Sequence, residues 1–150
     1  MIKVKCNLGC GKKQYPGSGM VEIDKNDFGQ DYVLDLETEK LPFKDNSVDY
    51  LRADHLIEHL RDCQNVLNEA WRVLKPDGEF EIYVPYGLYE NQFSPVHKQL
   101  IVPYWFKWLE KDDNWELYGY RIWEIKLLET AKKKDGTPYE IHCKIMPYGK

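Results

Sequence analysis

The sequence predicts an α/β fold built on a largely parallel sheet that ends in an antiparallel hairpin. Three observations lead to this prediction. Short segments with apolar side chains at alternate positions recur along the chain and are typical of strands. Between two of them lies a segment with apolar residues at helical spacing, and strands that alternate with helices favour parallel pairing. Near the C-terminus an Asp-Gly pair separates two β-rich runs, which indicates a hairpin.

Five strands are expected in the first 86 residues. In the first of them Val4, Cys6 and Leu8 alternate with polar residues, so one side of the strand is apolar. The others repeat this pattern with different lengths. The expected strands are Lys3–Leu8, Met20–Asp24, Tyr32–Leu36, Val48–Ala53 and Glu79–Val84.

A helix is expected over Asp62–Leu74, between the fourth and fifth strands. Its apolar residues follow one another at spacings of one, three and four and form a single stripe. Pro76 disfavours helical geometry at Lys75, and Gly78 accepts turn dihedrals, so a turn over Lys75–Gly78 is expected to end the helix.

The C-terminal part predicts one more helix and two strands. Pro103 suits a first helical position, and aromatic residues follow it at helical spacing as far as Leu109. Two β-rich runs, Trp115–Thr130 and Tyr139–Ile145, are joined through Lys132–Gly136, which we expect to form the tip of a hairpin.

Length and composition favour one cytoplasmic domain over residues 1–150. Lys and Arg number 21 against 25 Asp and Glu, and this acidic balance disfavours a nucleic-acid partner. No apolar run approaches the roughly 20 residues that span a bilayer, and the N-terminus lacks the apolar segment of a signal peptide. The four cysteines show no CxxC spacing, so neither a disulfide framework nor a zinc knuckle is expected.

One face of the sheet is expected to be poorly covered. Only about eleven residues, 9–19, separate the first two strands, which is too few for a crossover helix with its loops. Several strands also carry charges at alternate positions, whereas buried parallel strands are apolar on both faces. A ladder of Glu22, Lys5, Arg52 and Glu81 then either contacts water or is covered by a homodimer partner or another subunit.

A glycine loop directly follows the first strand. Its sequence is Asn7-Leu8-Gly9-Cys10-Gly11, and glycines let a backbone turn sharply and approach a ligand. The dinucleotide pattern G-x-G-x-x-G fails because Gln14 replaces its third glycine, and no Gly-Lys-Ser/Thr follows as in a P-loop. Asp24 ends the second strand, where a carboxylate can bind both ribose hydroxyls. The glycine loop and Asp24 together indicate a nucleoside site at the carboxyl edge of the sheet.

At these residues the chain resembles the class I S-adenosylmethionine-dependent methyltransferases, and in particular a small subgroup of predicted methyltransferases with an Asn-Leu-Gly-Cys-Gly loop. The resemblance covers residues 3–86 and implies a Rossmann-like sheet whose first crossover helix is shortened or missing. Its motifs come in the order of the family: Asn-Leu-Gly-Cys-Gly (7–11), Val-Glu-Ile-Asp (21–24), Asp-Leu (35–36), Leu-Pro-Phe (41–43), Asn-Ser-Val-Asp-Tyr (46–50), His-Leu-Ile-Glu-His-Leu (55–60) and Asn-Glu-Ala-Trp-Arg-Val-Leu-Lys-Pro-Asp-Gly (68–78).

The resemblance implies that S-adenosylmethionine binds along the glycine loop and leaves as S-adenosylhomocysteine. Leu8, Gly9, Cys10 and Gly11 would surround its methionyl part, and Asp24 would hold the ribose hydroxyls. The Cys10 side chain is then a small packing residue rather than a nucleophile, because no base is near it in sequence.

The remaining cofactor contacts are implied further along the chain. Asp35 and Leu36 would lie near the adenine, and Asp54 and His55 beside the methionyl group and the transferred methyl. Asn7 stands where the family commonly has an acidic residue, which weakens the expected contact with the amino group of the cofactor. The missing first helix removes part of the wall over the cofactor, so the site is expected to be open or completed by another chain.

The acceptor is expected to bind in the second half of the chain, residues 87–150, beside the cofactor half, residues 1–86. Tyr86, Tyr89 and His97 are candidates for lining the acceptor site, and His97 has a side chain suited to a general base. His55 is the other candidate for a catalytic role. A surface loop with a satisfied histidine is the alternative reading of this segment, and the acceptor itself is not identified.

Two other functions stay open. The chain is either an active methyltransferase or a non-catalytic S-adenosylmethionine-binding module, such as a subunit of a larger complex. A zinc hydrolase is the remote alternative, because His55-x-x-Glu58-His59 matches the inverted zincin motif. The favoured interpretation requires no metal. Ala53-Asp54-His55 follows the fourth strand in place of the Asn/Asp-Pro-Pro-Tyr motif, which disfavours amino-directed DNA methylation.

Overall fold

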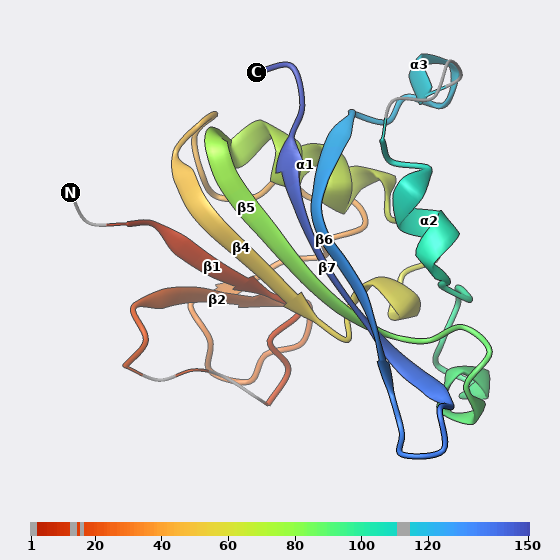
Figure 1. The fold of residues 1–150 in the computed structure, drawn as a ribbon. Helices are drawn as coiled ribbons and strands as arrows, with labels where there is room; N and C mark the ends of the chain where they lie inside the picture. Colours follow the sequence, from red (N-terminus) through yellow and green to blue (C-terminus); the bar gives the residue numbers. More distant parts are fainter. Residues whose placement is uncertain (1–2, 13–14, 16, 111–114) are drawn as a thin grey trace.

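The computed structural model describes residues 3–12, 15, 17–110 and 115–150, and a single mixed sheet forms its centre (Figure 1). Its seven strands lie in the order β3-β2-β1-β4-β5-β7-β6. The strands are β1 (Lys5–Leu8), β2 (Met20–Asp24), β3 (Tyr32–Val33), β4 (Val48–Asp54), β5 (Leu74–Pro85), β6 (Trp123–Lys132) and β7 (Pro138–Pro147).

The pairing of the strands confirms the predicted fold class. β1 lies between β2 and β4 and is parallel to both, and β4 is parallel to β5. β7 is antiparallel to β5 and to β6, with which it forms the C-terminal hairpin. At the hairpin tip the Lys133 N–H donates to the Thr137 carbonyl, and Gly136 has a φ of 87°, a left-handed conformation that glycine adopts readily.

Helical segments pack against one face of the sheet and close the core there (Figure 1). The alternating apolar side chains Leu8, Leu51 and Phe80 are fully buried, as are Leu67 of α1 and Phe106 of α2. Among the described residues no helix is long and apolar enough to cross a membrane. The helical segments are η1 (Ile57–His59), α1 (Gln64–Val73), η2 (Glu90–Phe93), α2 (Pro103–Lys107) and α3 (Trp115–Tyr118).

The connection between β1 and β2 lacks the usual crossover helix in the part of 9–19 that the structure describes, as the sequence predicted. The Cys10 N–H donates to the Ile23 carbonyl at 3.0 Å, and the Ser18 N–H donates to the Tyr15 carbonyl at 3.1 Å. The first bond ties the connection to β2, and the second closes a turn within the connection. Gln14, on which the dinucleotide pattern failed, lies outside the described residues.

The turn predicted over Lys75–Gly78 is wrong. The helix ends at Val73, but Leu74 is already extended and begins β5. Leu74 pairs with Val48 and Glu79 with Tyr50, so the intervening residues of β5 bulge out of the ladder. Pro76 is tolerated in such a bulge because its missing N–H is not needed for pairing.

Two other strand predictions need correction. The segment Trp115–Tyr118 is helical, and β6 begins only at Trp123. The residues before β6 are bound to α1 instead, since the Asn68 side chain donates to the Gly119 carbonyl at 2.8 Å. The third strand stops at Val33 rather than Leu36. Asp35 starts a turn there, and its side chain accepts the Glu37 N–H at 2.9 Å.

The second face of the sheet is polar, as expected from the charges at alternate positions. Glu81 is its centre: it accepts hydrogen bonds from Tyr50, from Tyr83 (3.1 Å) and, at 2.7 Å, from His142. The Arg52 guanidinium lies 3.4 Å from the same carboxylate. Burial alone would raise the pKa of Glu81, but these donors and the Lys144 charge lower it to about 2. The polar face is thus an organised network, and whether a second chain covers it stays a prediction.

Candidate functional site

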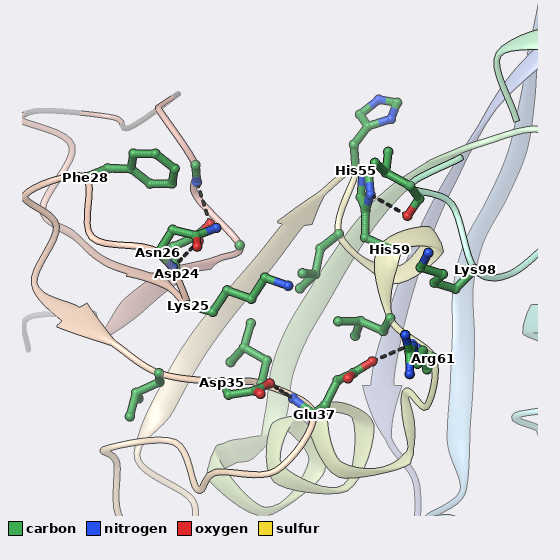
Figure 2. A pocket seen from close by; sticks show the side chains of 17 residues that line it. Asp24, Lys25, Asn26, Phe28, Asp35, Glu37, His55, His59, Arg61 and Lys98 are labelled. Carbon is green, nitrogen blue, oxygen red and sulfur yellow. Dashed lines mark hydrogen bonds between the residues drawn. The ribbon is translucent and has the colours of Figure 1, made fainter. Parts of the chain in front are cut away.

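A pocket of about 680 Å³ lies at the carboxyl edge of the parallel strands, where ligands bind in open α/β sheets. The glycine loop and the turns after β2 and β3 form one side, and η1 with the segment around Lys98 forms the other (Figure 2). The lining residues are Gly9, Gly11, Asp24, Lys25, Asn26, Phe28, Leu34, Asp35, Leu36, Glu37, His55, Leu56, His59, Leu60, Arg61, Val96 and Lys98.

Both glycines of the loop have a backbone conformation that disfavours a side chain, and Gly9 also lacks the space for one. Gly9 and Gly11 have φ values of 67° and 54°, which side chains rarely tolerate. A Cβ on Gly9 would also lie 2.7 Å from Cδ1 of Leu56, whereas a Cβ on Gly11 would meet nothing within 4 Å. The Leu56 side chain therefore packs directly on the backbone at Gly9, beside the pocket that both residues line.

Asp24 is held in place by the loop that precedes it. The residue is only 8% exposed, and its carboxylate accepts the Gly11 N–H at 2.8 Å through Oδ2 and the Asn26 N–H at 2.9 Å through Oδ1. Each carboxylate oxygen can accept a second hydrogen bond. The arrangement holds two hydrogen-bond-accepting oxygens of Asp24 at the pocket, which suits a ligand with two neighbouring hydroxyl groups.

Asp35 and Glu37 connect the two sides of the pocket. The Glu37 N–H donates to Asp35, and the Glu37 carboxylate accepts the backbone N–H groups of Arg61 and Asp62, just after η1 (Figure 2). The turn after β3 is thus fastened to the opposite wall, which keeps Asp35 at the pocket.

His55 has a strained backbone at the end of β4. Its φ is 54°, uncommon for a residue with a side chain, and its N–H donates to the Tyr83 carbonyl at 2.9 Å. Three carboxylates surround the imidazole. Glu58 lies 3.3 Å from Nδ1 and raises the pKa of His55 to about 9, with Glu140 and Asp54 adding to the effect and partial burial opposing it. His55 is therefore a cation at neutral pH.

The structure brings six of the ten predicted cofactor residues to the pocket, and four do not line it. The buried Asn7 side chain donates to Glu22 at 2.7 Å on the polar face of the sheet. Leu8 is in the core, and burial raises the pKa of the Cys10 thiol to about 11, which favours packing over nucleophilic chemistry. Asp54 contacts Arg52 at 3.4 Å. The six lining residues are Gly9, Gly11, Asp24, Asp35, Leu36 and His55.

The three candidate acceptor residues are not among those that line this pocket. The Tyr86 N–H donates to the Tyr139 carbonyl, and the Tyr89 ring lies 6.4 Å from that of Tyr139, near the hairpin. His97 lies nearer, because its neighbours Val96 and Lys98 both line the pocket. The centroid of its ring is 4.7 Å from the centroid of the His59 ring.

Sequence reasoning missed several lining residues. Lys25, Asn26 and Phe28 lie in the turn after Asp24, and the amine of Lys25 points toward the middle of the pocket (Figure 2). Their position in the turn after a strand that ends at the site was a usable signal. Arg61 and Lys98 had no such signal, since they reach the pocket only through the packing of η1 against the segment after η2.

The helical spacing on which the inverted zincin alternative depends is absent. The short helix η1 begins at Ile57, and His55 lies before it in a left-handed conformation, so His55 and His59 do not occupy successive turns of one helix.

Comparisons with known proteins find similarity to methyltransferases. Residues 16–82 match the family described as "Methyltransferase domain". The ubiquinone/menaquinone biosynthesis C-methyltransferase UbiE of Rickettsia bellii is 43% identical over 114 residues, or 70% of this chain and 43% of that protein. The chain spans only 23% to 43% of the length of the first five such relatives.

Solved structures share the fold. A S-adenosylmethionine-dependent methyltransferase from Aquifex aeolicus superposes with a TM-score of 0.63 at 17% identity, covering 97% of this chain and 82% of that one. A chain of the complex that contains the Haloferax volcanii Trm112 methyltransferase activator has the same TM-score at 15% identity, with the same coverage.

The fold and the comparisons point to the same group of proteins. The sheet has the fold of solved structures described as S-adenosylmethionine-dependent methyltransferases, and the match of residues 16–82 to a methyltransferase domain bears out the resemblance predicted from the sequence. The residues present also fit S-adenosylmethionine, because a fixed carboxylate at Asp24 and open space beside the backbone of Gly11 lie on one pocket. The Asn-Leu-Gly-Cys-Gly subgroup stays a prediction.

Proposed function

We propose that this protein is a S-adenosylmethionine-dependent methyltransferase whose acceptor is not yet identified. One observation carries the proposal: the Asp24 carboxylate is fixed by the glycine loop at the edge of a 680 Å³ pocket. A ribose has two adjacent hydroxyls that such a carboxylate binds. The UbiE proteins, named as C-methyltransferases, support transfer of a methyl group as the reaction.

In this proposal the chain's own residues bind and orient, because methyl transfer depends mainly on positioning. The cofactor supplies a methyl group already activated by its sulfonium. Gly9 and Gly11 border the methionyl part, Asp24 binds the ribose, and Asp35 with Leu36 lies at the adenine. The remaining cofactor contacts predicted from the sequence, namely Asn7, Leu8, Cys10, Asp54 and His55, stay predictions.

The acceptor side of the site has several candidate residues. Tyr86, Tyr89 and His97 stay candidates for acceptor contacts, and His97 and His55 for catalytic roles. The cationic state of His55 favours a hydrogen-bonding or electrostatic role for it over that of a base at neutral pH. The division into a cofactor half and an acceptor half, the cytoplasmic location and a homodimer or partner subunit on the open face also stay predictions.

Calorimetric titration with S-adenosylmethionine and S-adenosylhomocysteine tests the proposal. Wild type is expected to bind both saturably, and Asp24→Ala to lose at least about tenfold in affinity, since one hydrogen-bonded carboxylate is worth about 1.5–3 kcal/mol. Asp27→Ala is the matched control: this carboxylate lies three residues away, is exposed and does not line the pocket. Equal affinities for wild type and Asp24→Ala would contradict the assigned site.

Binding alone does not separate an enzyme from a cofactor-binding module. The open polar face favours the module as the second candidate, because a partner subunit there could supply catalytic groups. Release of S-adenosylhomocysteine in a screen of acceptors with radiolabelled cofactor would establish the enzyme. Saturable binding with turnover only after a partner chain is added would establish the module.

A further inference from the structure

Three side chains that can bind a metal ion meet beside the pocket. Glu58 and His59 belong to η1, and His97 comes from the turn after η2. One possible ligand atom from each lies within 4.8 Å of the other two. The two segments are far apart in the sequence, so only the tertiary structure brings the three side chains together.

Both histidine rings are oriented for metal binding. Nδ1 of His59 lies 3.3 Å from the Val96 carbonyl, and Nδ1 of His97 lies 3.1 Å from the Gln92 carbonyl. A carbonyl oxygen only accepts, so these contacts assign the hydrogen to Nδ1 and leave the lone pair on Nε2. Metal-binding histidines commonly donate their second ring N–H to a backbone carbonyl in this way.

The surroundings of the Glu58 carboxylate are a second, independent observation in favour of a cation site. Its side chain is fully buried, and neither carboxylate oxygen accepts a hydrogen bond from the part of the chain that the structure describes. The nearest basic atoms are Nδ1 of His55, at 3.3 Å, and Nε2 of His59, at 3.8 Å. The His55 cation compensates part of this buried charge, and the two carboxylate oxygens without hydrogen bonds leave Glu58 able to bind a further cation.

The backbone holds the cluster together. The Lys98 N–H donates to the Glu58 carbonyl at 2.6 Å, and the Gln99 side chain donates to the Leu60 carbonyl at 2.9 Å. The turn that carries His97 is therefore fastened to η1 at Glu58 itself. Zinc ligands lie about 2.0–2.2 Å from the ion, so the three groups must close slightly, and the exposed side chain of His59 has room to do so.

We propose that this protein binds one divalent transition-metal ion of the zinc class through Nε2 of His59, Nε2 of His97 and a carboxylate oxygen of Glu58. Two imidazoles and one carboxylate suit zinc or cobalt, and three protein ligands leave a fourth position for water or a substrate atom. The set differs from the inverted zincin motif, because Glu58 is a ligand and His97 replaces His55. The inference is independent of methyl transfer.

Titration of the chelator-treated full chain with metal alone tests the proposal. Calorimetry with Zn²⁺ and visible absorption with Co²⁺ are expected to show one ion per chain in tetrahedral coordination. His97→Ala and Glu58→Gln are expected to weaken binding at least roughly tenfold, since even indirect changes at metal sites cost 10–100-fold. His142→Ala removes a histidine from the polar face of the sheet and serves as the matched control that leaves binding unchanged.

Circular dichroism of each variant separates loss of a ligand from loss of fold. Glu58→Gln preserves the buried shape, and His97 is in a partly exposed turn, so both variants are expected to fold. Saturable binding in wild type that folded variants lose would confirm the site. No saturable binding in wild type, or equal affinity in His97→Ala, would overturn it and leave the His55–Glu58 ion pair as the compensation for the buried carboxylate.

Discussion

The two faces of the central sheet are stabilised by different interactions. On one face most alternate positions of the inner strands are apolar and buried under helical segments, as with Phe80 of β5. On the other face Glu81, the next residue, joins a network of tyrosine, arginine, histidine and lysine side chains. The difference shows that a parallel sheet does not need two apolar faces when its polar side chains satisfy one another.

The largest effect is expected from one pair of substitutions in β5 that point to opposite faces. Phe80→Ala removes a fully buried ring 6.2 Å from that of Trp123 and is expected to cost about 3–5 kcal/mol of stability. Tyr83→Ala removes a half-buried ring that stacks on His142 and is expected to cost about 1–2 kcal/mol. Urea unfolding measures both. Equal losses would mean that the polar face is also a packed core.

Acid is expected to destabilise the polar face selectively. The pKa of Glu81 is about 2 in the folded protein against an ordinary value of 4.5, so its contribution is complete above about pH 4.5 and is lost as the pH falls toward 2. The loss is on the order of 2–3 kcal/mol. Glu81→Gln should be less stable than wild type at pH 6 and lose less on acidification. Parallel pH profiles of unfolding for the two proteins would contradict the role of Glu81.

The smallest effect is expected at the rim of the same network. Lys144 lies 3.1 Å from Glu79 and 3.5 Å from Glu81, with its side chain about a third exposed. Exposed ion pairs contribute little and are screened by salt, so Lys144→Ala is expected to cost at most about 1 kcal/mol. Unfolding at low and high salt checks this, and a large cost that persists at high salt would indicate that Lys144 is part of a buried network.

Most of the fold was predictable, because alternation and helical spacing are local signals. The parallel strands, the helix before β5, the missing first crossover helix and the C-terminal hairpin follow from such patterns. The errors have tertiary causes. Pro76 and Gly78 are typical of a turn, yet pairing with β4 keeps their segment in a bulged strand. The residues before Gly119 form a short helix held by α1.

The pocket shows the same division between local and tertiary signals. Gly9, Gly11 and Asp24 were predictable because a strand–glycine turn and an acidic strand end place them at one edge. The contribution of Arg61 and Lys98, and the meeting of Glu58 with His97, depend on how η1 packs against the segment after η2. No periodicity in the sequence encodes that contact.

The structure of the complex with S-adenosylhomocysteine would locate the cofactor relative to Asp24 and the glycine loop. Both ribose hydroxyls are expected to bind the Asp24 carboxylate, with the amino-acid part along Gly9–Gly11 and the adenine beside Asp35. A ligand bound elsewhere, or in this pocket with its ribose away from Asp24, would contradict the assignment of the glycine loop and the strand-end carboxylate as the cofactor site.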